Sequence, residues 1–256
     1  MTTALVTGAS GGIGEAIARE LAAHRHDLVL VARSEAKLRA LADELAAAHG
    51  ITVDVLAADL SAPGAGTALA SRLGDRTIDV LVNNAGLGDY GEFRLADPAK
   101  LSEMVQLNVA TLTELTRALL PAMVERRAGK VLNVASTAGF MPGPLMAVYY
   151  ATKAYVLSLG EALADEVRGT GVTVTTLCPG PIATGFQSGA DMGESKLVRG
   201  KQLMSADTCA KAAVKAMNRG RVVVIPGLMN RIQAVTPKLL PRRFVPGIVR
   251  RAQAPH

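Results

Sequence analysis

The stretch Ala4-Leu5-Val6-Thr7-Gly8-Ala9-Ser10-Gly11-Gly12-Ile13-Gly14 decides the expected fold of this chain. Its first four residues form a short, mostly apolar run that predicts a buried strand, and an amphipathic helical pattern begins at Ile13. Between them, small residues allow a tight turn whose backbone approaches a phosphate closely, beside the unpaired N–H groups of a helix N-terminus. The stretch therefore predicts a strand, a turn and a helix that hold a dinucleotide pyrophosphate through Gly8, Ser10, Gly12, Ile13 and Gly14.

Two other motifs share part of this pattern. A Walker A loop needs Lys and then Ser or Thr after its last glycine, whereas Ile13 follows Gly12, so a P-loop nucleotidase is disfavoured. The run from Gly8 to Gly12 also matches the G-x-S-x-G elbow of α/β-hydrolases, which requires an acid and then a histidine downstream. Three of the four histidines precede most of the predicted sheet and the fourth is His256, so a hydrolase is disfavoured as well.

The same rhythm of strands and helices continues along the chain. Continuous apolar runs predict strands at residues 4–7, 28–32, 52–57, 79–83, 130–135, 173–177 and 221–225. Helical patterns separate them at residues 13–24, 35–48, 64–73, 98–127, 149–168 and 206–218. Repeated βα units join parallel strands by right-handed crossovers. We therefore predict an α/β fold with one Rossmann-like, doubly wound parallel sheet of about seven strands in residues 1–227, followed by a basic, proline-punctuated extension in residues 228–256.

Composition and charge disfavour several classes of protein. The 256 residues are 49% hydrophobic and 20% charged, which is a globular composition. The net charge of +6 comes from residues 228–256, which hold six Lys and Arg residues and no acid, while the rest of the chain holds 22 bases and 22 acids. A nucleic-acid-binding function is disfavoured because the predicted domain has no basic excess. The chain has no bilayer-length apolar run, no signal peptide and no metal-ligand spacing, so we expect a cytoplasmic protein without a metal site.

The end of the second predicted strand indicates which dinucleotide is bound. An acidic residue there would bind the ribose 2′-hydroxyl of NAD, whereas an arginine accommodates the 2′-phosphate of NADP. The chain has Ala32-Arg33 and no carboxylate at this point. We therefore expect Arg33 to favour NADP(H) over NAD(H) through charge-assisted hydrogen bonds.

Four polar residues are the candidates for chemistry: Asn108, Ser136, Tyr149 and Lys153. Tyr149 and Lys153 are four residues apart in a predicted helix and therefore share one face. A nearby ammonium stabilises a phenolate and lowers a tyrosine pKa, so that the hydroxyl can exchange a proton with a carbonyl oxygen. Ser136 follows a predicted strand and can hydrogen-bond the same oxygen. By spacing alone Tyr150, three residues before Lys153, competes with Tyr149 for this role.

Taken together, these motifs resemble the short-chain dehydrogenase/reductase family in its NADP-preferring type. The resemblance covers residues 3–227 and rests on Thr7-Gly8-x-x-x-Gly12-x-Gly14, Asp59-Leu60, Asn83-Asn84-Ala85-Gly86, Asn108, Ser136, Tyr149-x-x-x-Lys153, and Pro179-Gly180 followed by Thr184. It implies an oxidoreductase that transfers a hydride between NADP(H) and an alcohol or carbonyl substrate. The turn departs from some NADP-dependent members, because Ser10 and Gly11 supply no second basic residue.

The resemblance also implies a role for each matching residue. Tyr149 is the general acid/base, and Tyr150 is structural. Lys153 lowers the tyrosine pKa and binds the nicotinamide ribose, Ser136 orients the substrate oxygen, and Asn108 holds a water that links Lys153 to solvent. The remaining positions contact the cofactor: Asp59 at the adenine, Asn83 along the groove, Pro179, Gly180, Ile182 and Thr184 beside the nicotinamide, and Leu60, Ala85 and Gly86 to complete the set.

Two segments bear on the substrate and on partners. The segments 139–148 and 184–205 contain several apolar side chains. These are equally consistent with lining a site for an apolar or amphipathic substrate and with packing in a core or a subunit interface, and the sequence favours neither: Phe140, Met141, Pro142, Leu145, Met146, Phe186, Met192, Leu197 and Leu203. In residues 228–256 apolar residues alternate with arginines, which suits a weak contact with a membrane surface, a subunit contact or a cover over the substrate pocket.

Two further expectations concern assembly and activity. The resemblance implies a homodimer or homotetramer, formed through the helices at 98–127 and 149–168. The alternative to an enzyme is a non-catalytic NADP-binding sensor or scaffold, which the intact set of Asn108, Ser136, Tyr149 and Lys153 disfavours.

Overall fold

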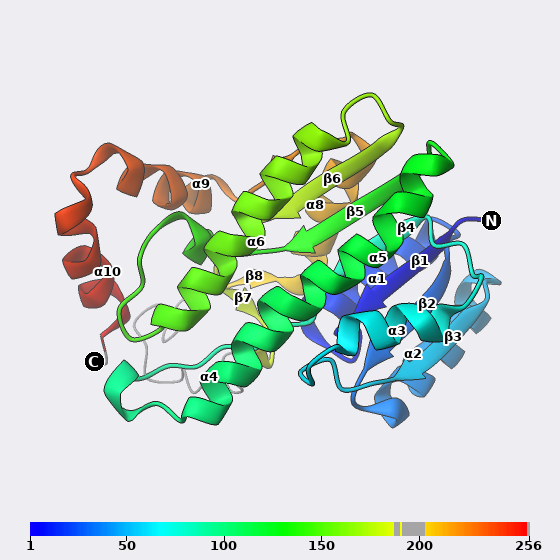
Figure 1. Ribbon diagram of the computed structural model, residues 1–256, viewed down its shortest axis with the longest axis horizontal. Coiled ribbons are helices and arrows are strands. Elements are labelled where there is room, and N and C mark those ends of the chain that lie inside the picture. The colour runs from blue at the N-terminus through cyan, green and yellow to red at the C-terminus, as the bar shows by residue number, and fades with distance from the viewer. Residues whose placement is uncertain (187–189, 191–202, 255–256) are drawn as a thin grey trace.

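Seven parallel strands form one sheet in the part of the chain that this computed structural model describes, which is residues 1–186, 190 and 203–254 (Figure 1). β1 pairs with β2 on one side and with β4 on the other, so the strand order β3-β2-β1-β4-β5-β6-β9 reverses beside β1. Ligands of such sheets bind at this reversal, outside the carboxyl ends of the strands. The doubly wound sheet predicted from the sequence is confirmed, with strands β1 (Thr3–Thr7), β2 (Asp27–Ala32), β3 (Val53–Ala57), β4 (Val80–Asn83), β5 (Gly129–Val134), β6 (Val172–Leu177) and β9 (Val223–Val224).

Helices cover both faces of the sheet, which explains why its strands are continuously apolar. One face holds α1 (Gly12–Ala23), α2 (Glu35–His49) and α8 (Ala206–Asn218), and the other holds α3 (Ala65–Leu73), α5 (Leu112–Glu125) and α6 (Ala147–Glu166). Ala4 and Val6 of β1 pack in the first layer, whereas Leu5 packs in the second, and all three are fully buried. Successive side chains of a strand point to opposite faces, so both faces of β1 require apolar residues.

The predicted helix at residues 98–127 is three elements instead of one. α4 (Pro98–Val105) begins after Asp97, whose carboxylate accepts a hydrogen bond of 2.9 Å from the N–H of Ala99. A π-helix (Gln106–Thr111) follows, and α5 continues from it. The apolar pattern continues through this segment, so it does not reveal a turn that is one residue wider. The wide turn fully buries Asn108, and such turns are common at functional sites.

The last part of the chain, residues 226–254, is called the tail below. Its prolines divide it into α9 (Leu228–Val235), 3₁₀ turns at Thr236–Leu239 and Arg242–Phe244, and α10 (Val245–Gln253). Val245 and Val249 of α10 pack against Met146 and Tyr150 at the start of α6. Figure 1 shows α9 and α10 together at one end of the molecule.

Short elements complete the carboxyl edge of the sheet. β7 (Ile182–Ala183) pairs in parallel with β8 (Met204–Ser205), and further 3₁₀ turns lie at Phe93–Leu95 and Thr137–Phe140. The predicted loop at 184–205 is described only at its two ends and at residue 190, and Met192 and Leu197 lie outside the described residues. Across the described ranges, no helix combines the length and the apolar character needed to cross a bilayer.

Candidate active site

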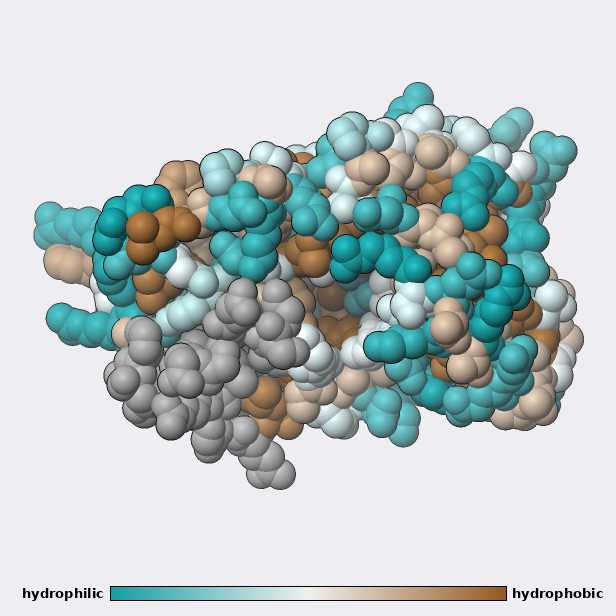
Figure 2. All heavy atoms as spheres, turned by 90° about the horizontal axis from the view of Figure 1, so that it is seen from below, coloured by the Kyte–Doolittle hydropathy of each residue, from teal (hydrophilic) through white to brown (hydrophobic). Residues whose placement is uncertain are grey.

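A continuous cavity of about 830 Å³ lies at the carboxyl ends of the strands. Figure 2 shows a hollow with apolar atoms inside it on the face seen from below. Gly14, Asn83 and Asn108 are the predicted site residues that lie behind the cavity lining. The other predicted site residues line it: Gly8, Ser10, Gly12, Ile13, Arg33, Asp59, Leu60, Ala85, Gly86, Ser136, Tyr149, Lys153, Pro179, Gly180, Ile182 and Thr184.

The glycine turn after β1 is too crowded for side chains. Gly8 and Gly12 have φ angles of 67° and 59°, a region that favours glycine. A Cβ atom on Gly8 would lie 2.7 Å from Nδ2 of Asn84, and one on Gly14 would lie 2.3 Å from the carbonyl oxygen of Gly8. Gly14 therefore lets α1 start close to the turn and does not contact the cavity itself. The backbone cradle and the N-terminus of α1 have the geometry that a pyrophosphate requires.

Asn84 holds this turn against the end of β4. Its Nδ2 donates to the carbonyl oxygens of Thr7 at 2.9 Å and Gly8 at 3.1 Å. The hydroxyl of Thr7 accepts hydrogen bonds from the N–H groups of Asn84 and Ala85 at 3.0 and 3.1 Å. Asn84 lines the cavity, although we assigned the groove to Asn83.

Asn83 is buried in the sheet and does not line the cavity. Its Nδ2 donates to Oγ1 of Thr116 and Oδ1 of Asn133, both at 2.9 Å. Asn83 and Asn133 are register partners on β4 and β5, so their amides meet across two strands. The alternation of side chains along β4 separates the two asparagines. Asn83 therefore braces the sheet, and its neighbour Asn84 contacts the cavity.

The end of the cavity next to β2 and β3 carries opposite charges. Nη1 of Arg33 lies 3.8 Å from Oε1 of Glu103 on α4, and both residues line the cavity. Asp59 accepts hydrogen bonds from the N–H and the hydroxyl of Ser61 at 3.0 and 2.7 Å, which lower the pKa of its carboxyl group. Sequence reasoning missed Glu103, because α4 is far from β2 in the chain and carries no motif.

Lys153 is buried beneath the cavity floor. Its Nζ donates to the carbonyl oxygen of Val134 at 2.9 Å and lies 5.7 Å from the centroid of the Tyr149 ring. A Cβ atom on Gly86 would lie 3.4 Å from Nζ, so Gly86 leaves the ammonium accessible from the loop after β4. Burial lowers the pKa of Lys153 to about 8.

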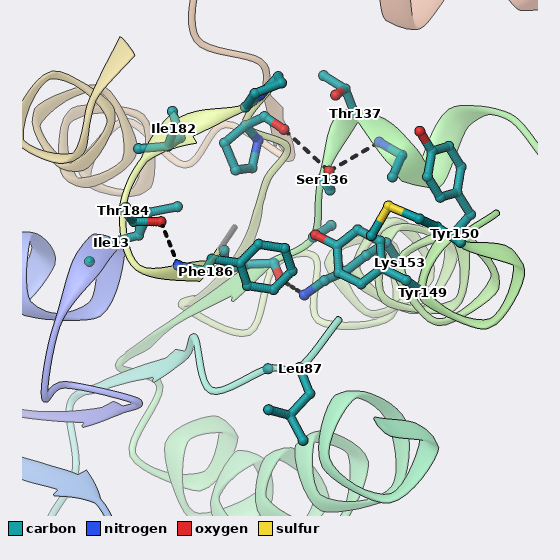
Figure 3. A pocket seen from close by; sticks show the side chains of 18 of the residues that line it. Ile13, Leu87, Ser136, Thr137, Tyr149, Tyr150, Lys153, Ile182, Thr184 and Phe186 are labelled. Atoms are coloured by element: carbon teal, nitrogen blue, oxygen red, sulfur yellow. Dashed lines mark hydrogen bonds between the residues drawn. The ribbon is translucent and has the colours of Figure 1, made fainter. Parts of the chain in front are cut away.

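Tyr149 lies in the cavity with its hydroxyl directed at Ser136 (Figure 3). Burial raises the pKa of Tyr149 to about 12, and its hydrogen bond with Ser136 acts in the opposite direction. We expected Lys153 to lower this pKa. The result has the opposite sign because desolvation of a buried phenolate outweighs the stabilising contacts. Tyr149 is therefore protonated at neutral pH and can act as a proton donor.

Ser136 is positioned by the turn that follows β5. Its Oγ accepts a hydrogen bond from the N–H of Ala138 at 3.1 Å, as the cap of the 3₁₀ turn Thr137–Phe140, and it donates to the carbonyl oxygen of Pro179 at 3.4 Å. These contacts hold the hydroxyl between the ends of β5 and β6. Ser136 and Tyr149 thus present two hydroxyl groups to the same part of the cavity (Figure 3).

Asn108 supports the site from the π-helix. Its Oδ1 accepts from the N–H of Leu87 at 2.9 Å, and its Nδ2 donates to the carbonyl oxygen of Leu87 at 2.9 Å and to Oγ1 of Thr152 at 3.0 Å. The side chain therefore ties the loop after β4 to α6, on which Tyr149 and Lys153 lie. That Asn108 holds a water near Lys153 stays a prediction.

Tyr150 is distinguished from Tyr149 by its partners. Its ring is buried, and its hydroxyl accepts a hydrogen bond of 2.5 Å from Nε2 of Gln253 at the end of α10. The carbonyl oxygen of Gln253 accepts a hydrogen bond of 2.7 Å from the hydroxyl of Tyr90. Tyr150 therefore fastens the tail to α6, which agrees with the structural role that the resemblance implied.

The part of the cavity beyond Tyr149 is apolar. The ring centroid of Phe186 lies 5.4 Å from that of Tyr149. Of the predicted substrate-side residues, Met141, Met146 and Phe186 line the cavity, whereas Phe140, Pro142, Leu145 and Leu203 do not. The tail supplies a further wall of the cavity, which the sequence did not assign. Its apolar side chains come from α9, from α10 and from the segment between them: Ile232, Leu240, Val245, Ile248 and Val249.

The doubly wound sheet, the glycine turn at its reversal and the Tyr149–Lys153 pair in the cavity define a dinucleotide-dependent oxidoreductase. The model of the short chain dehydrogenase family matches residues 2–194. The chain belongs to this family, and it is an enzyme of the kind that interconverts alcohols and carbonyl compounds.

Comparison of the sequence and comparison of the structure with known proteins both give the same family. The chain is 32% identical over 251 residues to the very-long-chain 3-oxoacyl-CoA reductase of Mus musculus, covering 95% of this chain and 78% of the relative. A short-chain dehydrogenase from Sphingobium yanoikuyae in complex with NADPH has 35% identity and a TM-score of 0.85, over 93% of this chain and 94% of that one. A bulky-bulky ketone specific alcohol dehydrogenase from Comamonas testosteroni has 30% identity and a TM-score of 0.80, over 96% and 99%.

Proposed function

We propose that this protein is an NADP(H)-dependent reductase of an apolar or amphipathic ketone, with Tyr149 as the general acid/base. The observation that carries the proposal is one continuous cavity, with the glycine turn and Arg33 at one end and the Tyr149 and Ser136 hydroxyls beside an apolar chamber at the other. Two related proteins support it, because one is named for a bulky ketone and the other for a long-chain 3-oxoacyl thioester.

The residues present fit a nicotinamide dinucleotide. The crowding at Gly8 and Gly14 makes the backbone cradle that a pyrophosphate requires. Arg33 directly follows β2, with no carboxylate at that point, which favours a 2′-phosphate over a free 2′-hydroxyl. The complex of the Sphingobium yanoikuyae relative with NADPH is consistent with this choice. Pro179, Gly180, Ile182 and Thr184 line the opposite wall, where they would flank the nicotinamide.

The chain's own residues supply the proton chemistry. When bound, the dinucleotide supplies the hydride to the carbonyl carbon or accepts it from the alcohol carbon. Ser136 donates a hydrogen bond to the carbonyl oxygen and holds it near Tyr149. Tyr149 donates its proton to this oxygen as negative charge develops there. The Lys153 ammonium stabilises the phenolate that remains, until the phenolate regains a proton from solvent.

The apolar chamber limits the substrate class. Met141, Met146 and Phe186 from the body of the protein line the cavity together with Val245 and Val249 from the tail. Such walls reward an apolar substituent on the ketone by about 25 cal/mol for each Å² removed from water. Of the polar groups in this part of the lining, the Tyr150 hydroxyl is already paired, because it accepts a hydrogen bond from Nε2 of Gln253. We infer that the substrate carries a bulky apolar group on one side of its carbonyl.

The test is a pair of measurements on the full chain. Binding of NADPH and NADH is titrated first, and oxidation of NADPH is then followed with apolar ketones of increasing size. We expect tighter binding of NADPH, turnover of the bulkier ketones, and loss of turnover by about 10²–10⁴-fold in Tyr149→Phe with NADPH binding retained. Tyr150→Phe is the matched control and should keep its turnover.

Two outcomes would contradict the proposal. Binding of NADPH without turnover of any ketone would favour the sensor or scaffold alternative. Equal losses in Tyr149→Phe and Tyr150→Phe would contradict the assignment of Tyr149. A homodimer or homotetramer, proposed through α4, α5 and α6, is checked separately by sedimentation of the same preparation.

A further inference from the structure

The tail exposes apolar side chains and arginines on the same part of the molecule. Eight of its large apolar side chains are between 37% and 80% exposed: Leu228, Met229, Ile232, Val235, Leu239, Leu240, Phe244 and Ile248. Five exposed arginines lie among them: Arg231, Arg242, Arg243, Arg250 and Arg251. Figure 2 shows apolar and strongly hydrophilic atoms side by side at the tail end of the molecule. A patch of this kind is unusual for a surface that only faces water.

The spacing along α10 separates an inner from an outer side. Val245, Val249 and Gln253 recur every four residues, are buried and face α6. Phe244, Ile248 and Arg251 follow at spacings of four and three residues and form a second stripe about a third of a turn away. Phe244 is 51% exposed and Ile248 is 50% exposed. Among the described residues, the outer stripe therefore stays about half exposed and combines apolar groups with a positive charge.

Charge decides which partner this outer surface fits. Residues 228–256 contain six Lys and Arg residues and no acid, whereas the rest of the chain contains 22 of each sign. A second copy that placed the same surface against itself would bring like charges together, which is unfavourable. A single-stranded nucleic acid would use aromatic side chains for stacking, whereas seven of the eight exposed apolar residues are aliphatic or Met.

We propose that the tail docks on an anionic membrane surface. Phe244, Leu239 and Ile248 insert among the lipid headgroups, and the arginines bind lipid phosphates. A basic and apolar surface of this type binds membranes through both contributions at once. The Arg243 guanidinium lies 4.7 Å from the centroid of the Phe244 ring, so a positive charge and an apolar anchor would contact the membrane at the same place.

The position of the cavity gives this contact a consequence. Ile232, Leu240 and Ile248 are partly exposed and also line the cavity, so its rim belongs to the docking surface. A substrate dissolved in the bilayer reaches the apolar chamber along this rim without crossing bulk water. This consequence rests on the proposed function, whereas the docking itself does not.

The test measures binding of the full chain to vesicles and requires no turnover. Vesicles of phosphatidylcholine alone are compared with an equal mixture of phosphatidylcholine and phosphatidylglycerol at low salt. Arg250→Gln with Arg251→Gln removes two charges from the tail, and Leu239→Ser with Phe244→Ser removes two apolar anchors that do not line the cavity. The controls are Arg219→Gln with Arg221→Gln, and Phe93→Ser with Leu95→Ser, whose apolar side chains are 66% and 70% exposed. Thermal unfolding of each variant confirms that it folds.

We expect the natural chain to bind the anionic vesicles and to dissociate as salt is added. Loss of the two tail arginines should weaken binding by roughly thirtyfold, about fivefold for each charge. Loss of the two tail anchors should weaken it by about tenfold or more, and both control pairs should bind as the natural chain does.

Other results overturn the proposal. No binding at low salt contradicts it directly. If the tail and control arginine pairs lose vesicle binding equally, the net charge of the protein alone is responsible. If the variant without the two apolar anchors binds vesicles as the natural chain does, the surface is a site for polyanions in general. A tail variant that alters the sedimentation coefficient in the absence of lipid would assign the surface to a second copy of the chain.

Discussion

Replacing Glu103 with Gln should increase the affinity for NADPH and leave the affinity for NADH unchanged. Glu103 lies 3.8 Å from Arg33 in the cavity and, if Arg33 binds the 2′-phosphate as proposed, would compete with it for that guanidinium. The variant keeps the size of the side chain and removes its charge. Arg33 then becomes available to the phosphate, and a repulsive carboxylate disappears from the same end of the cavity.

The size of the effect follows from the distance and the exposure. Two unit charges 3.8 Å apart interact by about 1 kcal/mol in water. The side chains of Arg33 and Glu103 are 66% and 36% exposed, so solvent screening reduces the pair to about 0.2–1 kcal/mol. Releasing Arg33 should therefore tighten NADPH binding by about 1.4- to fivefold.

Fluorescence titration with both reduced dinucleotides measures the effect. Glu92→Gln is the matched control, because Glu92 pairs with Arg94 at 2.8 Å and does not line the cavity. The gain should shrink as salt is added. Weaker NADPH binding in Glu103→Gln, or an equal gain for NADH, would refute the assignment of Arg33 to the 2′-phosphate.

Three further predictions test the turn, the acid/base and the tail. Gly14→Ala places a Cβ 2.3 Å from the Gly8 carbonyl oxygen. It should therefore lower the free energy of unfolding by about 1–3 kcal/mol and weaken NADPH binding. Gly11→Ala, which has open space at its Cβ, is the control and should have neither effect. Below pH 8, where Lys153 keeps its ammonium, the rate of alcohol oxidation should rise with pH by about tenfold per unit, because the Tyr149 phenolate must form well below its pKa of about 12; a flat profile in this range would contradict Tyr149 as the base. Gln253→Ala leaves the buried Tyr150 hydroxyl without its donor and should cost about 1–3 kcal/mol in thermal unfolding, whereas the exposed Gln233→Ala should cost little.

All seven strands of the main sheet could be predicted, with bounds that differ from the observed ones by one or two residues, because their determinants are local. Strands buried on both faces must be continuously apolar, and the turn after β1 needs glycine at Gly8 and Gly12 whatever the rest of the chain does. The helix at 98–127 was the exception. The π-helix at Gln106–Thr111 adds one residue to a turn without interrupting the apolar pattern. The hydrophobic periodicity therefore predicted one continuous helix and did not reveal the wider turn.

The site could be predicted only in part. Residues at strand ends were assigned to the cavity because parallel strands bring their carboxyl ends to one edge. The contact with the cavity was assigned to Asn83, although its neighbour Asn84 makes it. The sequence does not distinguish the two, because the role of Asn83 depends on its hydrogen bond with Asn133 on another strand. Glu103 and Gln253 carry no motif, and they reach the cavity region only through the packing of α4 and α10.

By itself, the sequence determined the class of this protein: a doubly wound sheet, a dinucleotide turn and a tyrosine with a lysine four residues later. Those features depend on spacing within one element or one turn, which a linear pattern records. The tertiary structure alone decided that burial raises the pKa of Tyr149, that Tyr150 pairs with Gln253, and that the tail forms a wall of the cavity. These properties depend on desolvation and on contacts between residues far apart in the chain, such as Tyr150 with Gln253, and no local pattern contains them.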